Sequence, residues 1–328
     1  MQITLSDGRV LGLESSKGAD IVYISHAHSD HSRKGNIFSS KQTFDLLNSS
    51  GGSILHQIDK DVKLYPAGHI LGSTQIEYVN GHTTVYTGDM KLREGFTTER
   101  AEILKCDELH IDCTFGHPDF EFDSKEVLAD RIDRWTRTRM MVGNNVVFGA
   151  YSTGKAQELI YILNNYSNIT PVVDQSIEEK CKIYEKYGIK LNRVVIGSKE
   201  ASEIMRDKFV YVVPFNLVNQ QSERWLTTQY KQVSFAVVTG WAKKYRYRYH
   251  AFPLSDHAGF SEILNYVTES GAKEIICHYG NATFMSGFLR SKGYNSITDK
   301  EWEYLQRGNE SIKSNGCGKQ DMLMSIHV

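Results

Sequence analysis

Up to about residue 115 the chain consists of short apolar runs separated by turn residues, a pattern that predicts strands and few helices. Ile21–Ile24 is such a run and predicts a buried strand. Residues 75–79 and 82–86 both suit strands, and the Asn80-Gly81 pair before the second favours a tight type I′ turn. These residues are therefore predicted to form a hairpin.

Beyond about residue 120 the pattern changes to strands that alternate with helices. No internal repeat or low-complexity segment interrupts it. The order of elements predicts an α/β protein in which sheets are covered by helices and an inserted domain interrupts the main one. Strands are predicted at 146–148, 209–214, 235–238 and 274–277, and helices at 157–163, 177–187 and 258–269.

Composition is typical of a globular protein and sets the expected compartment. The 328 residues, 40% of them hydrophobic and 23% charged, are enough for about two domains. We see no signal peptide at the first residues and no apolar run near the ~18 residues that a membrane helix needs. The five cysteines form no Cys-x-x-Cys pair, which suits a reducing compartment. We therefore expect a cytoplasmic protein that does not bind membranes.

The distribution of charge leaves nucleic-acid binding open. A net charge of −1 argues against a protein that coats nucleic acid through its overall charge. Residues 243–250 nevertheless alternate cations with aromatic side chains, which can neutralise phosphates and stack bases. The same alternation would suit an amphipathic strand with its tyrosines inward. Four arginines between Arg131 and Arg139 lie in a predicted helix and are a second basic cluster.

The strongest chemical signal is the hexapeptide His-Ala-His-Ser-Asp-His at residues 26–31, directly after the predicted strand. Residues two apart at a strand end point the same way, so His26 and His28 can bind one cation. Asp30 and His31 can face a second. Imidazole and carboxylate are the ligands that zinc takes in open, catalytic sites. The alternative, a surface turn rich in histidine, explains the pattern less well.

Two downstream residues can complete a metal site. His69 lies in a loop with a glycine on each side, which allows the backbone to approach closely. Asp89 follows a predicted strand, where its carboxylate can bridge two cations. Either residue alone would more often belong to an ordinary turn. Together with the hexapeptide, both predict metal ligands.

The order of these motifs resembles the metallo-β-lactamase superfamily: the hexapeptide, then Gly-His at 68–69, then Gly-Asp at 88–89. Residues 112–116, 254–257 and 277–280 are similar to the three further motifs of its nuclease branch, the β-CASP family. The resemblance covers about residues 10 to 290. It implies an αββα sandwich with an inserted α/β cap domain. The chain then divides into residues 1–120 and 236–328 for the metallo-β-lactamase domain and 121–235 for the cap.

The resemblance also implies a set of ligands and catalytic residues. Two divalent ions are expected, most readily zinc, with manganese or magnesium as alternatives. Two cations ~3.5–4 Å apart can generate a hydroxide near neutral pH and stabilise both oxygens of a phosphodiester displacement. His257 would protonate the leaving oxygen and Asp112 would orient its ring, with Asp30 as a third catalytic residue. One ion would be held by His26, His28 and His69, the other by Asp30, His31 and His278, with Asp89 bridging them.

Two loops are predicted to bind the substrate. Residues 149–156 nearly match a phosphate-binding loop, but Ala156 stands where a Ser or Thr would hold magnesium, so ATP hydrolysis is not expected. A strand, a loop with glycines and a helix N-terminus still suit an anion. The loop is similar to a stretch in β-CASP caps, so Ser152 and Lys155 are predicted to contact substrate. Thr239 and Gly240 are predicted to do so because Thr-Gly-Trp resembles a loop that receives a terminal phosphate in Artemis-type nucleases. An ordinary helix cap and an ordinary turn are the alternatives.

Some details differ from the family pattern or favour different substrates. Glu14 stands where the family usually carries an aspartate. His278 and the loop at 68–73 resemble RNA-cleaving members, whereas Ala27, Ser29 and residues 149–158 resemble small DNA exonucleases found with ligases.

We therefore expect a metal-dependent nuclease that hydrolyses phosphodiester bonds, most readily a DNA exonuclease acting from 5′-phosphorylated ends in repair. Nucleic acid is the expected partner, DNA before RNA, and association with repair or processing factors is compatible with this reading. An RNA-processing endo- or exoribonuclease is the first alternative. A small-molecule metallo-hydrolase and a non-catalytic nucleic-acid-binding subunit are the others.

Overall fold

Successive side chains on the first strands point alternately into two layers of hydrophobic core. The computed structural model describes residues 1–47 and 53–315, with the side chains of residues 308–315 left out. Ile21 and Tyr23 of strand β3 join a core cluster that also contains Ile76 and Tyr86 from two later strands. Val22, between them in sequence, packs on the opposite face with Ile37, as the two-residue period of a strand requires. The predicted strand at Ile21–Ile24 is confirmed except at its last residue.

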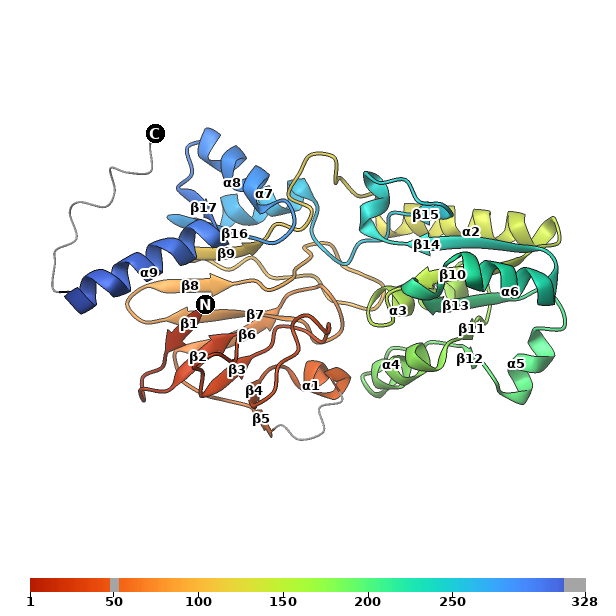
Figure 1. Cartoon of the computed structure of the whole chain (residues 1–328), viewed down its shortest axis with the longest axis horizontal. Coiled ribbons are helices and arrows are strands. Elements are labelled where there is room, and N and C mark those ends of the chain that lie inside the picture. Colours follow the sequence, from red (N-terminus) through yellow and green to blue (C-terminus); the bar gives the residue numbers. More distant parts are fainter. Residues whose placement is uncertain (48–52, 316–328) are drawn as a thin grey trace.

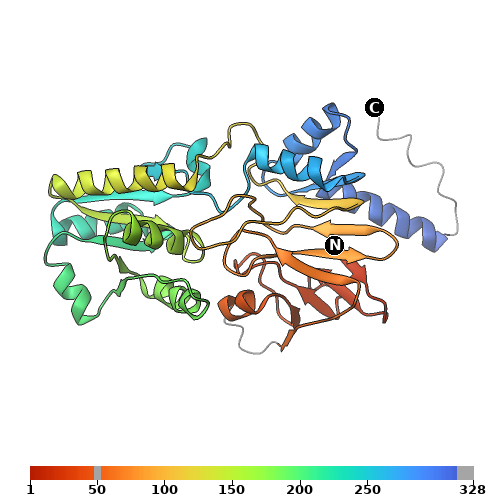
Figure 2. The same ribbon diagram turned by 180° about the vertical axis from the view of Figure 1, so that it is seen from behind.

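The molecule has two lobes that lie side by side (Figure 1), and the view from behind shows the same division (Figure 2). The first lobe contains two sheets. In the first of these, β1 and β2 are antiparallel and the following neighbours are parallel. Its strands are β1 (Gln2–Thr4), β2 (Val10–Leu13), β3 (Ile21–Tyr23), β4 (Asn36–Phe38) and β5 (Ser53–Leu55), with helix α1 (Lys41–Leu47) after β4.

The second sheet of this lobe has the order β17-β16-β9-β8-β7-β6. The predicted hairpin is confirmed, because β7 and β8 pair antiparallel on either side of Asn80-Gly81. Leu109 and Ile111 of β9 pack beneath α7 and α8, which sends His110 and Asp112 to the opposite face. The elements are β6 (Val62–Pro66), β7 (Thr74–Val79), β8 (Thr83–Tyr86), β9 (Glu108–Asp112), β16 (Glu274–His278), β17 (Ser296–Thr298), α7 (Phe260–Ser270), α8 (Ala282–Ser291) and α9 (Asp299–Asn315).

The second lobe is a parallel sheet with helices around it, in the order β12-β11-β13-β10-β14-β15. Residues 146–148, 210–214 and 235–238 lie in its strands, so the strand predictions are confirmed except at Phe209. Residues 157–163 and 177–186 lie in its helices, so the helix predictions are confirmed except at Tyr187. Its elements are α2 (Lys125–Met141), β10 (Asn145–Ala150), α3 (Lys155–Asn165), β11 (Val172–Val173), α4 (Gln175–Lys186), β12 (Val194–Val195), α5 (Lys199–Ile204), β13 (Val210–Pro214), η1 (Phe215–Leu217), α6 (Gln220–Tyr230), β14 (Val233–Val238), η2 (Gly240–Lys243) and β15 (His250–Phe252).

The last strand of the second lobe bears on the predicted division of the chain. β15 pairs with β14 although it begins after residue 235, where the cap was predicted to end. The division at 120 and 235 stays a prediction, and its last part includes residues 316–328, which lie outside the described residues. In the second lobe the loops at the carboxyl ends of the strands face the first lobe (Figure 1). Binding loops of parallel α/β sheets lie at this edge.

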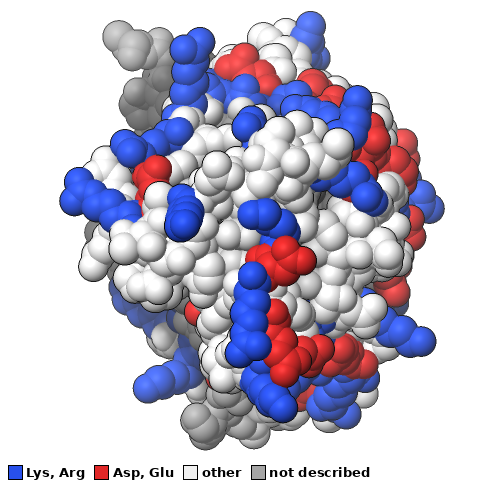
Figure 3. Space-filling model, turned by 90° about the vertical axis from the view of Figure 1, so that its right-hand side faces the viewer, with Lys and Arg blue, Asp and Glu red and all other residues white. Residues whose placement is uncertain are grey.

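The arginine-rich helix α2 is confirmed, but three of its four arginines are paired with carboxylates. Arg131 contacts Asp123, Arg134 contacts Asp130 and Arg137 contacts Asp133. Figure 3 shows the end of the second lobe that faces away from the first, where lysine and arginine are interspersed with acidic side chains. This end of the molecule therefore presents mixed charge. Within the described ranges, every helix is too short or too polar to span a bilayer.

Candidate metal centre and active site

Two glycines bring separate loops against the histidine hexapeptide. Gly88, just before Asp89, has a φ of +54°, and a Cβ there would lie 2.6 Å from the Ser25 Cβ. Gly68, just before His69, has a φ of +76°, and a Cβ there would lie 2.2 Å from the Lys91 carbonyl oxygen. Only glycine fits such positions. The sequence therefore permits His69 and Asp89 to approach the residues after β3.

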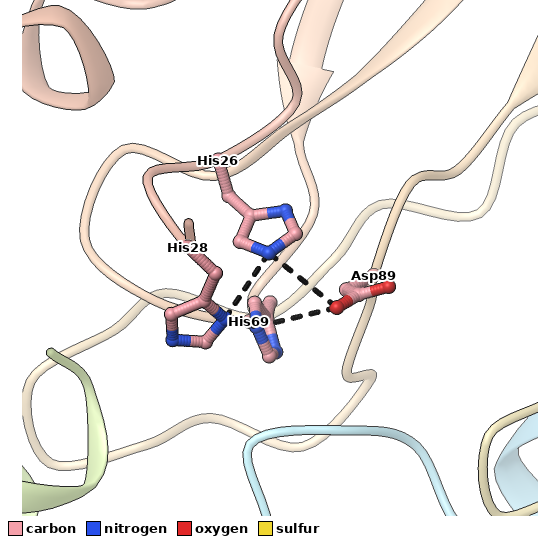
Figure 4. Close-up of side chains that lie close together, drawn as sticks. All are labelled: His26, His28, His69 and Asp89. Carbon is pink, nitrogen blue, oxygen red and sulfur yellow. Dashed lines mark hydrogen bonds and ion pairs between the residues drawn. The ribbon is translucent and has the colours of Figure 1, made fainter. Parts of the chain in front are cut away.

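Four side chains from three loops converge on one point (Figure 4). His28 Nδ1 lies 3.1 Å from both His26 Nε2 and His69 Nε2. The Asp89 Oδ2 atom lies 3.4 Å from His26 Nε2 and 3.6 Å from His69 Nε2. The candidate ligand atoms of these four residues are all within 4.8 Å of one another. The structure thus brings together four of the predicted metal ligands.

The electrostatics of this group suit a divalent cation. Burial lowers the pKa of His28 to about 4 and holds the pKa values of His26 and His69 well below the usual value, so the imidazoles are neutral. Burial also raises the pKa of Asp89 to about 7, because the carboxylate lacks sufficient positive charge around it. Neutral imidazole and carboxylate are donors for zinc and its neighbours. A cation here would supply the missing charge, and the residues fit it.

Hydrogen bonds on the far side of each ring orient the donors. His69 Nδ1–H donates to the Asp256 carbonyl at 3.0 Å, which leaves Nε2 free to bind. His28 Nε2–H donates to the Thr153 carbonyl at 3.2 Å, which leaves Nδ1 free. His26 Nδ1 lies 2.8 Å from the Ser25 hydroxyl. Such partners fix the ring and the tautomer of a metal-binding histidine. One of them, Thr153, belongs to the second lobe.

His31 faces the other side of Asp89. Its Nε2 lies 3.6 Å from Asp30 Oδ2 and 3.8 Å from Asp89 Oδ2, while its Nδ1 lies 2.7 Å from Glu14 Oε2. Burial lowers the pKa of His31, but the hydrogen bond and charge of Glu14 outweigh it and raise the pKa to about 9. The Asp30 side chain is 79% exposed. Asp30 and His31 are thus adjacent to Asp89, with Asp30 on the solvent side.

Glu14 organises this region although it replaces the usual aspartate. It is buried, has a φ of +52° and accepts hydrogen bonds from the hydroxyls of Ser25, Tyr86 and Tyr279. Those to Tyr86 and Tyr279 measure 2.6 and 3.1 Å. The longer side chain therefore reaches His31 and anchors it. The contacts of Tyr86 and Tyr279 with Glu14 were not anticipated, although Tyr279 lies in the motif at residues 277–280.

We expect Glu14→Gln to weaken metal binding next to His31 by about 10- to 100-fold, the usual effect of losing a carboxylate that supports a metal-binding histidine. The amide keeps the size of the side chain but loses the charge that faces His31 Nδ1. Isothermal titration calorimetry of the metal-free protein with zinc measures the change in affinity. Glu77→Gln, on strand β7, is the matched control. Affinities equal to wild type at every site would show that Glu14 is only a packing residue.

His278 lines one cavity with Asp30 and His31 but makes its hydrogen bond to another histidine. Its Nε2 lies 2.9 Å from His110 Nδ1, and His110 Nε2 lies 2.9 Å from Glu108 Oε1. Burial lowers the pKa of His278 to about 3. The structure does not bring it together with Asp30 and His31 in one ligand group, as far as the described residues extend. Its role as a ligand stays a prediction.

The predicted proton donor and its partner are in contact. His257 Nδ1 lies 2.8 Å from Asp112 Oδ2, and the other Asp112 oxygen accepts the Thr114 N–H at 2.8 Å. Burial lowers the pKa of His257, but the charges of Asp112 and Asp89 outweigh it and raise the pKa. His257 Nε2 lies 3.9 Å from Asp89 Oδ2, on the side of the metal-binding group. The ring therefore presents Nε2 to the place where a substrate would react.

The predicted substrate-binding residues have partners within the protein. Lys155 Nζ lies 2.7 Å from Asp256 Oδ2, and both side chains are buried. Ser152 is half-buried, and its carbonyl accepts the Gln157 amide at 3.0 Å. Thr239 and Gly240 are buried at the end of β14. Direct contact of these four residues with substrate stays a prediction, and Asp256 is a partner of Lys155 that the sequence pattern did not reveal.

Lys155→Met is expected to destabilise the protein by about 3–5 kcal/mol, because it leaves the buried Asp256 carboxylate without its counter-charge. Urea unfolding followed by circular dichroism measures the loss. The double variant with Asp256→Asn should recover much of it, since neither charge then remains. Lys273→Met removes the exposed pair with Asp107 and should change stability by no more than about 1 kcal/mol. Equal effects of the buried and exposed lysines would contradict this account.

The site is a buried group of candidate metal ligands with a histidine–aspartate pair beside it, a combination that suits metal-dependent hydrolysis. No family model matches the chain. Several curated proteins are similar to it in sequence. "Probable DNA ligase" of Opitutus terrae is 30% identical over 307 residues, 87% of this chain and 29% of the relative. "Probable RNase MJ4" of Methanocaldococcus jannaschii is 33% identical over 144 residues, 41% of this chain and 32% of the relative.

A third relative matches most of the chain. "5′ exonuclease Apollo" of Gallus gallus is 24% identical over 273 residues, 76% of this chain and 56% of the relative. The chain is also similar to the solved structure of a protein of unknown function from Enterococcus faecalis, with a TM-score of 0.56 and 16% sequence identity. The match covers 80% of this chain and 76% of that one, so the two proteins share a fold. The chain belongs to the β-CASP nuclease family of the metallo-β-lactamase superfamily. It spans about a third of the length of the first two relatives.

Proposed function

We propose that this chain is a metal-dependent DNA exonuclease that hydrolyses phosphodiester bonds from 5′-phosphorylated ends, in a repair role. One observation carries the proposal. The candidate ligand atoms of the buried Asp89 carboxylate and of three neutral imidazoles lie within 4.8 Å of one another, and Asp89 Oδ2 also lies 3.9 Å from His257 Nε2. A metal-binding group next to a positioned proton donor is what hydrolysis of a phosphodiester needs.

The side chains would divide the reaction between them. His26, His28 and His69 would hold one divalent cation, and Asp30, His31 and His278 the second, with Asp89 shared. When bound, the cations would polarise the phosphate and lower the pKa of a water. His257 would donate its Nε2 proton to the leaving oxygen, while Asp112 accepts the Nδ1–H at 2.8 Å and stabilises the charged ring. Asp30, at the solvent side, would meet the incoming water or substrate.

In the second ligand set, His278 Nε2 is hydrogen-bonded to His110. In this orientation of the ring only Nδ1 of His278 is open to a second cation. The first site, whose four side chains already converge, is the more complete of the two. We propose zinc as the resident metal, since imidazole nitrogens dominate the first site.

We also propose how the substrate lies. The two sheets of the first lobe would form the αββα sandwich, with residues 121–235 as the inserted cap; the pairing of β15 with β14 supports extending the cap to Phe252. Nucleic acid would run between the lobes. Ser152, Lys155, Thr239 and Gly240 would contact its phosphates, with Lys155 exchanging Asp256 for a phosphate. The four free, buried cysteines among the described residues support a reducing, cytoplasmic setting.

The coverage of the named relatives supports DNA over RNA as the substrate. The relative named a DNA ligase matches 87% of the chain, and the one named a 5′ exonuclease matches 76%. The relative named an RNase matches 41%, at 33% identity. The RNA-processing alternative therefore has a specific observation in its favour and is the second candidate function.

Matched DNA and RNA substrates separate the two candidates. Purified protein is incubated with zinc or manganese and with strands of the same sequence, labelled at the 3′ end and carrying a 5′-phosphate. We expect stepwise shortening of DNA from its 5′ end, with products that carry a 5′-phosphate. If the protein cleaves RNA efficiently and leaves DNA uncut, the RNA-processing alternative is the correct function. Failure to cleave either polymer with any divalent metal would overturn the proposal.

A further inference from the structure

Five aromatic side chains gather where strands of the second lobe end toward the first lobe. Tyr151 follows β10, Phe215 follows β13, and Trp241, Tyr245 and Tyr247 follow β14. The Tyr151 and Phe215 rings are stacked, with centroids 5.4 Å apart, and Phe215 meets Tyr247 edge-on at 6.3 Å. Tyr245 lies against Trp241 at 5.8 Å. We call these five side chains the aromatic platform.

Two rings of the platform are open to solvent: Tyr151 is 45% exposed and Tyr245 is 55% exposed. Phe215, Trp241 and Tyr247 are half-buried beside them. Residues 244–249 form no strand, so the alternation of cations and rings there does not serve to bury tyrosines in a sheet. Large aromatic side chains that stay exposed as a group indicate a binding surface. The amphipathic-strand interpretation of this segment is therefore wrong.

Contacts connect the platform to the catalytic residues. The Trp241 ring lies 4.8 Å from the Phe115 ring, and Phe115 lies 5.6 Å from His257. Gly240 allows this approach, because a Cβ there would lie 2.5 Å from the Phe115 ring. Tyr151 comes two residues before Thr153, whose carbonyl accepts the His28 N–H. A strand whose end reached the metal-binding group would thus pass the platform.

The same segment carries positive charge. Lys243, Lys244, Arg246 and Arg248 alternate with the tyrosines, and all four are exposed. Lys244 contacts Asp119 at 3.1 Å and Arg248 contacts Glu223 at 3.3 Å, so part of this charge is already balanced. Rings that accept bases beside cations that accept phosphates are the arrangement by which proteins bind single strands.

We propose that the aromatic platform binds unpaired bases of the nucleic acid strand, and so makes the protein select single-stranded or frayed ends. This inference rests on the proposed function, because it takes the substrate of that site to be nucleic acid. Every base has a face that can stack, so the platform imposes no sequence. A blunt duplex keeps its bases stacked on one another and must first unpair them, which costs energy.

Binding without cleavage tests the inference. The probe is a 5′-phosphorylated single strand of DNA with 2-aminopurine near its 5′ end, compared with the blunt duplex of the same sequence, in EDTA. We expect wild type to prefer the single strand and to quench its fluorescence by stacking. Tyr245→Ala should weaken binding of the single strand by about 5- to 150-fold, the range for loss of one stacked base, with little change for the duplex.

Matched variants make the result specific. Tyr245→Phe keeps the ring and should bind like wild type, and Tyr151→Ala should repeat the loss. Tyr304→Ala removes a tyrosine that is 65% exposed on α9 in the other lobe, and should have no effect. Two results would overturn the proposed role of the platform. One is that the wild type prefers the duplex. The other is that Tyr245→Ala and Tyr151→Ala bind the single strand as tightly as the wild type does.

The two proposals can fail separately. If the wild type cleaves DNA while the ring variants bind single strands normally, the platform is wrong and the nuclease remains. If the rings bind single strands but no metal supports cleavage, the nuclease is wrong and the platform remains.

Discussion

Asp89→Asn is expected to reduce phosphodiester cleavage by at least about 10³-fold and to release metal from the protein. The side chain lies within 4 Å of His26, His31 and His69 and supplies the negative charge that a cation between them needs. A bound metal contributes several kcal/mol to the transition state, and each ~1.4 kcal/mol is a factor of ten in rate. Initial rates on labelled DNA, together with metal content by mass spectrometry, measure both effects.

The matched control is Asp130→Asn, which removes an exposed carboxylate paired with Arg134 on α2. It should keep wild-type rate and metal content. Asp89→Asn has almost the same shape as the native side chain, and its folding is checked by thermal unfolding. Retention of both metal and activity in the Asp89 variant would show that this carboxylate does not bridge ions.

His257→Ala is expected to lower kcat by about 10²- to 10⁴-fold, because the imidazole would donate a proton. The metal held by His26, His28 and His69 should stay bound, since His257 belongs to a different candidate group, with Asp89 and Asp112. Asp112→Asn should give a loss of the same order, since Asp112 Oδ2 holds the ring at 2.8 Å. Single-turnover rates with saturating protein measure the chemical step.

His82→Ala, at a half-exposed histidine on the β7–β8 hairpin, is the control for the loss of an imidazole. The double variant of His257 and Asp112 should be little slower than either single variant, because the two act as a unit. Additive losses would mean that Asp112 has a separate role. A wild-type rate for His257→Ala would mean that another group donates the proton.

Much of the fold follows from local pattern. The two-residue period of Ile21, Val22 and Tyr23 and the Asn80-Gly81 turn are local features, and both elements formed as predicted. The end of the second lobe did not follow from such features. β15 is three residues long and joins the sheet by pairing with β14, a tertiary contact that no short window of sequence encodes.

Part of the candidate site could likewise be predicted from local sequence, and part of it could not. His26 and His28 lie two residues apart in the loop after β3, and glycines precede His69 and Asp89, so their convergence could be inferred from spacing and backbone. The bond of His278 to His110 depends on two neighbouring strands of one sheet, and that of Lys155 to Asp256 joins residues 101 apart. Such pairings are decided by side-chain packing across the whole fold, and the sequence pattern does not contain them.

Crystals grown with zinc and measured on both sides of its absorption edge test the central claim most directly. The account predicts an anomalous peak about 2.0–2.2 Å from His26 Nε2, His28 Nδ1, His69 Nε2 and an Asp89 oxygen. Zinc bound only elsewhere, or these four side chains without a peak at saturating zinc, would contradict it.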